Sequence, residues 1–275
     1  MPSTRNRFLF IPLLMTFLLT CNAFAGASDD NVPDNRARDH VLVFIEHENC
    51  AGAVKALNEA IAESDRAVLL LAGAMYEDGI CLKQDWPRAA AMYQRAHEAG
   101  NKAAIPRLVA GYALPGREQA SAIWWAAQSK ITFMSSCAPS ANPMTETDAF
   151  IDEMSKWSKE HMDACAYTLG VMFSIFGDME YPKDALSFGK SGNLRVRFEP
   201  SKGTVAWKKL EDTSPGMTIG VFTSNDITDA GSRKINNRLL DYADEIGKSA
   251  LKRYPRPARI QADWVVETNY FFKIE

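Results

Sequence analysis

Residues 67–100 read AVLLLAGAMYEDGICLKQDWPRAAAMYQRAHEAG, and this stretch decides how the first half of the chain folds. It contains two apolar, alanine-rich runs that are separated by a turn at Gly79. The second run begins at Asp85-Trp86-Pro87, where Asp is a favoured helix cap and Pro suits the first helical turn. The stretch therefore predicts two helices joined by a glycine turn.

The same pattern recurs at a spacing of 36 residues, which indicates a repeat across residues 51–130. The matching pairs are Ala60 and Ala96, Ser64 and Gly100, Ala67 and Ala103, and Tyr76 and Tyr112. Small residues recur where helices must approach closely, and Tyr and Trp fill the space between them. Periods of this length are typical of stacked helical hairpins that share a continuous core.

These residues resemble Sel-one-like repeats, which are relatives of the tetratricopeptide class. The signature residues are Ala67, Leu71, Tyr76, Gly79, Asp85, Ala89, Tyr93, Ala96 and Gly100. The next unit is shorter, because Tyr112 and Trp125 are 13 residues apart where Tyr76 and Tyr93 are 17 apart. The resemblance implies a solenoid-like stack of helices over residues 26–134, with a surface that binds proteins.

Residues 135–147 have the composition of a linker, and connecting helices follow to about Phe176. We therefore treat 135–180 as a segment that joins the two halves of the chain. His161 lies in this segment without a partner that the sequence can identify. An ordinary surface or interface histidine is the expected interpretation.

Alternating residues predict strands in the C-terminal half of the chain. Residues 193–199 alternate apolar and polar side chains, 200–203 predict a turn, and 204–210 predict the return strand. One helical stripe then contains Ile235, Leu239, Tyr242, Ala243, Ile246 and Ala250. A closing strand is predicted over 264–274, where one face carries Trp264, Val266, Thr268, Tyr270, Phe272 and Ile274.

This order of hairpin, helix and strand resembles the C-terminal domain of TonB-family energy transducers over residues 181–275. The residues that carry the resemblance are Tyr181-Pro182, Gly189 to Phe198, Gly203 to Val205, Ala250 to Pro257 and Phe271 to Ile274. Residues 211–233 form a longer insertion than the family has, and the chain lacks a Pro-rich spacer. The resemblance therefore implies a module that accepts an extended partner peptide, rather than a transducer of the proton gradient.

Two groups of residues are candidates for partner binding. The first is the predicted strand at 264–274, with Trp264, Val266, Tyr270 and Phe272 as candidate contact residues. The alternative is that these side chains only close the core. The second group is Trp124-Trp125, for which core packing with one half-exposed ring competes with a binding hot spot.

The first 25 residues predict a cleavable export signal. Arg5 and Arg7 precede an apolar run, and Ala23-Phe24-Ala25 is a signal-peptidase pattern. Lipoprotein cleavage at Cys21 and retention of residues 8–27 as a membrane anchor are the alternatives. Cleavage after Ala25 predicts a periplasmic protein without a stable membrane span.

Cys21 leaves with this signal, so the mature chain keeps four cysteines, which allow three disulfide pairings. An even number of cysteines in an exported chain is typical of disulfides. In a repeat hairpin, the start of one helix lies beside the end of its partner. This favours a bond between Cys50 and Cys81 and leaves Cys137 with Cys165. No Cys-x-x-Cys pair accompanies His47, so we predict neither a metal site nor a cofactor.

The chain has 275 residues, of which 47% are hydrophobic, and a net charge of −3 that becomes −5 once Arg5 and Arg7 are removed. This disfavours a nucleic-acid partner, since such proteins usually have a basic face and a pI above about 9. Phosphate-loop, dinucleotide and hydrolase motifs are missing from the sequence. The carboxylate pairs Asp29-Asp30 and Asp152-Glu153 have no partner that the sequence can identify, and the second is expected on a solvated helix face.

We therefore expect an α+β protein of two domains that is exported from a Gram-negative cell and is not an enzyme. Its expected function is to bind proteins through helical repeats and a TonB-like module. Two alternatives are an immunity or inhibitor protein for an exported toxin, and an anchored TonB-type energy transducer for outer-membrane transport.

Overall fold

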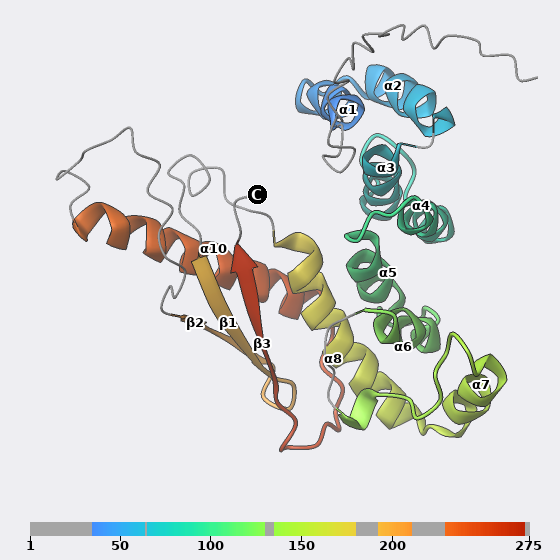
Figure 1. Cartoon of the computed structure of the whole chain (residues 1–275), viewed down its shortest axis with the longest axis vertical. Helices are drawn as coiled ribbons and strands as arrows, with labels where there is room; N and C mark the ends of the chain where they lie inside the picture. Colours follow the sequence, from blue (N-terminus) through green and yellow to red (C-terminus); the bar gives the residue numbers. More distant parts are fainter. Residues whose placement is uncertain (1–34, 64, 130–134, 180–191, 211–228, 273–275) are drawn as a thin grey trace, which may run out of the picture. The chain divides into compact units, whose positions relative to one another are not determined.

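The computed structural model describes residues 35–63, 65–129, 135–179, 192–210 and 229–272. Asn35–Glu275 form one compact unit. Helices come first in this unit, and a three-stranded antiparallel sheet follows (Figure 1). The α+β class predicted from the sequence is confirmed. The predicted signal peptide, the Tyr181-Pro182 motif and Ile274 lie outside the described residues.

The first part of the unit is helical, and its neighbouring helices pack against one another along the chain. Its elements are α1 (Arg36–Glu46), α2 (Cys50–Ala62), α3 (Arg66–Asp78), α4 (Trp86–Glu98), α5 (Ala104–Tyr112) and α6 (Gln119–Ala127). The pair α5 and α6 is shorter than the pair α3 and α4, as the shortened Tyr-to-Trp spacing predicts.

The ends of α3 and α4 are set by Asp65, Gly79 and Asp85, of which the sequence singled out Gly79 and Asp85. Asp65 Oδ1 accepts hydrogen bonds from the backbone N–H groups of Ala67 and Val68 at 2.7 and 3.0 Å. Gly79 ends α3 with a φ of 73°, a left-handed conformation that glycine adopts without steric cost. Asp85 then caps α4 by accepting from the N–H of Arg88 at 3.1 Å. The predicted hairpin is confirmed.

Two glycines let large aromatic rings lie directly on a helix backbone. A Cβ atom built at Gly73 of α3 would lie 2.3 Å from the ring of Tyr93 in α4. A Cβ atom at Gly111 of α5 would lie 1.9 Å from the ring of Trp86. Neither position can hold a larger residue unless the ring moves, so the small residues of the repeat are required by close packing.

The second part of the unit contains the sheet and the helices that cover it. Its elements are η1 (Ser135–Cys137), α7 (Thr147–Lys156), α8 (Lys159–Asp178), β1 (Gly192–Glu199), β2 (Thr204–Lys209), α10 (Asp229–Arg253) and β3 (Val266–Phe272). The strand order is β2-β1-β3, and both pairs are antiparallel. The predicted hairpin and long helix are confirmed. The last strand begins at Val266 and not at Trp264, whose N–H closes a turn on the carbonyl of Gln261 at 3.2 Å.

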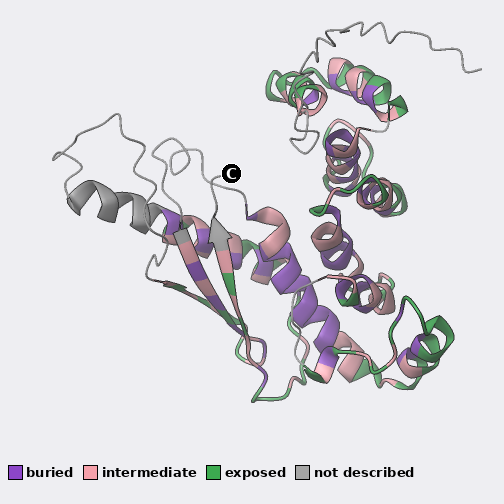
Figure 2. Cartoon of the chain, in the orientation of Figure 1, coloured by how far each residue is buried: buried purple, intermediate pink, exposed green. Residues whose placement is uncertain are grey.

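One face of the sheet is apolar and packs on α8 and α10. Leu194, Val196 and Phe198 of β1 are fully buried on this face. The ring of Phe198 contacts Tyr167 of α8, with 5.7 Å between ring centroids. Gly247 of α10 lies against β2. Figure 2 shows that α8 is buried along most of its length.

A single cluster of buried residues extends from α4 and α5 through α8 to the sheet and α10. Tyr254, the residue after α10, is buried against Gly170 of α8 and donates a hydrogen bond to the carbonyl of Ala110 in α5 at 2.6 Å. The helices from α4 onward and the sheet therefore share one hydrophobic core, while α1, α2 and α3 bury a separate cluster.

A buried carboxylate also joins these two parts. The side chain of Glu77 in α3 is only 3% exposed and pairs with Arg253 at the end of α10. It also accepts a hydrogen bond from the hydroxyl of Tyr93 at 2.8 Å and lies 3.9 Å from Arg117. Burial, followed by the charge of Glu77, raises the pKa of Tyr93, so this hydroxyl stays protonated and donates.

Candidate functional site

The outer edge of β3 is the candidate functional site. Among the described residues, β3 pairs with β1 on one side, and no described strand pairs with its other side. An unpaired edge presents a row of backbone N–H and C=O groups that can pair with another chain. The remaining question is which residues of β3 contribute these groups.

The hydrogen-bond pattern of the sheet answers this question. The N–H of Leu210 donates to the carbonyl of Asn193, its opposite residue in the β1–β2 register, at 2.9 Å. Backbone direction alternates along a strand in an antiparallel sheet. Asn193 therefore directs its backbone groups to β2, and Leu194 directs its groups to Tyr270 of β3.

The alternation continues along β3. Val266, Thr268 and Tyr270 lie opposite Phe198, Val196 and Leu194, so their backbone groups are directed to β1. The residues between them have the opposite direction. The backbone N–H and C=O groups of Glu267, Asn269 and Phe271 are directed away from β1, to the outer edge.

The two outer edges of the sheet differ in charge. β2 carries Lys208 and Lys209, and lysine on an edge strand opposes pairing with another chain. β3 carries one charged residue, Glu267, which lies 3.7 Å from Arg195 and 3.6 Å from Arg197 of β1. Its charge is therefore drawn toward the centre of the sheet, and β3 is the less protected edge.

Three of the side chains predicted to contact a partner, those of Trp264, Val266 and Tyr270, pack in or against the core. Trp264 is 5% exposed, and its indole N–H donates to Gln261 Oε1 at 3.0 Å. Val266 and Tyr270 are half-buried on the inner face, where the hydroxyl of Tyr270 donates to the carbonyl of Met179 at 2.7 Å. Trp264 therefore closes the core in the free chain, and contact of these residues with a partner stays a prediction. The side chain of Phe272 lies outside the described part of the chain.

Trp124 and Trp125 have different environments on α6. Trp125 is 7% exposed, Trp124 is half-buried, and their rings meet edge to face at 4.7 Å between centroids. This matches core packing with one half-exposed ring, one of the two interpretations that the sequence left open, and the binding hot spot stays a prediction.

Four cysteines in the described part of the chain form two disulfides. Cys50 bonds to Cys81, and Cys137 bonds to Cys165. Cys50 begins α2 and Cys81 follows α3, so the first bond closes a helical hairpin as predicted. Disulfides form and persist in oxidising compartments, which fits a protein that works outside the cytosol.

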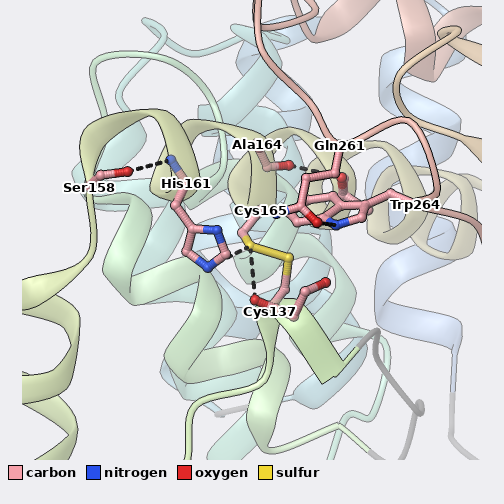
Figure 3. The surroundings of a disulfide bond; sticks show 9 residues. Cys137, Ser158, His161, Ala164, Cys165, Gln261 and Trp264 are labelled. Atoms are coloured by element: carbon pink, nitrogen blue, oxygen red, sulfur yellow. Dashed lines mark hydrogen bonds between the residues drawn. A yellow bond between two sulfur atoms is a disulfide. The ribbon is translucent and has the colours of Figure 1, made fainter.

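The second disulfide lies beside a histidine that the sequence left without a partner. His161 Nε2 is 3.8 Å from Cys165 Sγ, as Figure 3 shows. The imidazole also packs edge to face on Trp157 at 4.4 Å and on Trp264 at 6.0 Å between ring centroids. His161 is half-buried, as suits a surface or interface histidine, and α8 places it between two aromatic rings that the sequence keeps far apart.

Glu153 also has partners that the sequence did not reveal. Its carboxylate accepts hydrogen bonds from the N–H and hydroxyl of Ser140 at 3.0 and 2.7 Å, and from the N–H of Ala141 at 3.1 Å. These bonds to the N–H and then the hydroxyl of Ser140 lower the pKa of Glu153. Asp152 is exposed and Glu153 is partly exposed, so the predicted solvated face stands, and α7 uses Glu153 to hold the loop that precedes the helix.

In the described ranges, no group of three or more His, Cys, Asp or Glu residues is arranged to hold a metal ion. None of the helices in the same ranges is both long enough and apolar enough to cross a membrane.

We found no family model, no curated protein and no solved structure that matches this chain. The resemblances to Sel-one-like repeats and to the TonB C-terminal domain therefore stay predictions from the sequence. The edge of β3 is a candidate on its geometry alone.

Proposed function

We propose that this chain is an exported, non-enzymatic protein of the periplasm that binds an extended segment of a partner protein along β3. The observation that carries the proposal is the outward direction of the backbone groups of Glu267, Asn269 and Phe271. An added strand would satisfy these groups through main-chain hydrogen bonds, as in other cases of strand addition.

Three further features support this proposal. The sheet has its apolar face buried, so an added strand would extend it without disturbing the core. The two disulfides suit an oxidising compartment, and the predicted signal leads to the periplasm. The resemblances to a TonB-like module and to helical repeats both imply protein binding.

A photo-crosslinking amino acid placed at Asn269 tests the proposal. The full oxidised chain is incubated with periplasmic extract and irradiated, and a matched sample carries the same amino acid at Lys208 on the opposite edge. The expected result is one discrete crosslinked partner at position 269 that position 208 does not give. Equal yields from both positions would count against the edge of β3.

Two substitutions at the same position then separate backbone from side-chain binding. Asn269→Pro removes the outward N–H, and Asn269→Ala keeps it. Proline is tolerated on an edge strand when its missing N–H faces outward, so the fold is expected to persist. We expect Asn269→Pro to weaken binding of the purified partner at least about tenfold, which is about 1.4 kcal/mol. Asn269→Ala is expected to bind like the unmodified chain, and equal affinities for both variants would overturn the proposal.

A further inference from the structure

A pocket of about 340 Å³ lies on a different part of the molecule from the edge of β3. Its walls come from three parts of the chain: the loop between α5 and α6, the first turns of α8, and the segment that follows α10. Lys159, Asp163 and Tyr167 of α8 stand at four-residue spacing, so they share one helix face toward this pocket.

Positive charge predominates in this pocket. Arg117, Lys159 and Arg256 line it together with one carboxylate, that of Asp163. Lys159 Nζ lies 2.6 Å from Asp163 Oδ2, so this ion pair neutralises the charge of that carboxylate. Arg117 lies 3.9 Å from the buried carboxylate of Glu77, whereas no acid among the lining residues pairs with Arg256.

The two arginines are held in place by their other contacts. Arg117 donates to the carbonyl of Gly111 at 2.8 Å and stacks on the ring of Trp86 at 4.1 Å. Arg256 donates from Nη1 to the carbonyl of Ser201 at 2.9 Å. A guanidinium group has five N–H donors, so each arginine keeps donors for a ligand.

Two helices also begin at this pocket. Gln119 begins α6 and Lys159 begins α8, and both residues line it. The N-cap residue of α6, Glu118, makes no side-chain hydrogen bond to the first turn. The start of a helix carries partial positive charge and backbone N–H donors, which adds to the attraction of the arginines for an anion.

Most of the other lining residues carry rings. They are Pro115, Tyr167, Tyr254, Pro255 and Pro257, and Ala113 and Gly116 complete the lining. Pockets of this kind bind ligands that combine an apolar body with one polar group. A planar carboxylate matches the planar fork of an arginine side chain and can take two parallel hydrogen bonds from it.

We propose that this pocket binds a carboxylate attached to a small apolar group, with Arg256 and Lys159 contacting the carboxylate and the proline and tyrosine rings contacting the apolar part. Such a carboxylate has two sources, a free organic acid and the C-terminus of a peptide. A single negative charge suits the pocket better than two, because Asp163 would oppose the second.

Two probes distinguish the sources of the carboxylate. Benzoylglycine represents a free acid, and acetyl-Gly-Phe with a free carboxylate represents a peptide terminus. Binding of each to the full oxidised chain is measured by calorimetry and by the shifts of backbone NMR signals. At least one probe is expected to bind with a dissociation constant of about 1 mM or below. The tighter of the two identifies the source, and either order supports the proposal.

The amides of both compounds and phenyl phosphate test the chemistry. We expect each amide to bind at least about tenfold more weakly than its acid, because the charge-assisted hydrogen bonds are lost. Tighter binding of phenyl phosphate than of both acids would overturn the assignment to a carboxylate. Failure of both acids to bind at about 10 mM would overturn the pocket itself.

Variants that each remove one positive charge, with controls that remove the same charge elsewhere, test whether the ligand binds in this pocket. Lys159→Gln and Arg256→Gln are each expected to weaken binding about three- to tenfold. The controls are Lys156→Gln, an exposed lysine that also pairs with an aspartate four residues away, and Arg259→Gln, which lies near Arg256 but outside this pocket. Equal loss in the controls would contradict the proposal. None of these residues lies on β3. This test can therefore fail while the proposed function stands, and the proposed function can fail while this pocket binds its ligand.

Discussion

Replacing Glu77 with glutamine tests whether α10 is joined to the helical part of the chain as described. The side chain of Glu77 is 3% exposed, and the side chains of its partners Arg253 and Arg117 are 26% and 19% exposed. Glutamine keeps an acceptor for the hydroxyl of Tyr93 but removes the negative charge that pairs with two largely buried guanidinium groups. Breaking a buried ion pair in this way costs about 3–5 kcal/mol.

The lower end of that range applies here, because both arginines keep some contact with water. A loss of about 3 kcal/mol would lower the melting temperature by about 6–12 °C in a chain of this size. The assay is urea unfolding followed by circular dichroism with both disulfides intact. Glu98→Gln on the exposed end of α4 is the matched control and is expected to change the unfolding free energy by less than about 0.5 kcal/mol.

Adding Arg253→Met to Glu77→Gln completes a double-mutant cycle. The second change removes an unpaired buried charge, so the double variant is expected to be less destabilised than the sum of the single variants. Strict additivity, or a cost below about 1 kcal/mol for Glu77→Gln, would refute the description of this ion pair as a structural link.

Three further predictions follow from individual contacts. Gly111→Ala should cost about 1–3 kcal/mol in urea unfolding because its new Cβ would meet a tryptophan ring, whereas Gly177→Ala in α8 has room and should be neutral or stabilising. The lowered pKa of Glu153 stabilises the fold above about pH 4.5, its ordinary value, and this stabilisation is lost as the pH falls through the folded-state pKa. Glu153→Gln should therefore be less stable than the unmodified chain at pH 7, with a smaller difference at pH 3. Replacing both Cys137 and Cys165 with alanine should cost about 2–5 kcal/mol, and peptide mapping without reductant should recover this pair as one linked species.

Local residue chemistry explains why the helices and strands could be predicted. Asp65, Gly79 and Asp85 set helix ends through contacts within a few residues of themselves, so the sequence carries the whole signal. The alternation around Val196 similarly predicted β1 because one face of the sheet is buried and the other is not. The pairing of Cys50 with Cys81 followed from the geometry of one hairpin.

Contacts between distant segments could not be predicted in the same way. The ring contact of His161 with Trp264 joins residues that are separated by β1, β2 and α10. The pairing of Glu77 with Arg253 likewise depends on how α10 meets α3. The sequence singled out the same strand as a candidate for partner binding, but through side chains such as Trp264 and Tyr270 that face the core. The strand order and register were needed to locate the outward backbone groups of residues such as Asn269.

Residue-resolved amide hydrogen exchange tests the central claim most directly. In the free chain, the amides of Glu267 and Asn269 are predicted to exchange faster than those of Thr268 and Tyr270, which are paired with β1. When the crosslinked partner is added, the amides of Glu267 and Asn269 are predicted to slow to the rate of their neighbours. Exchange at these two amides that stays fast in the complex would contradict the account.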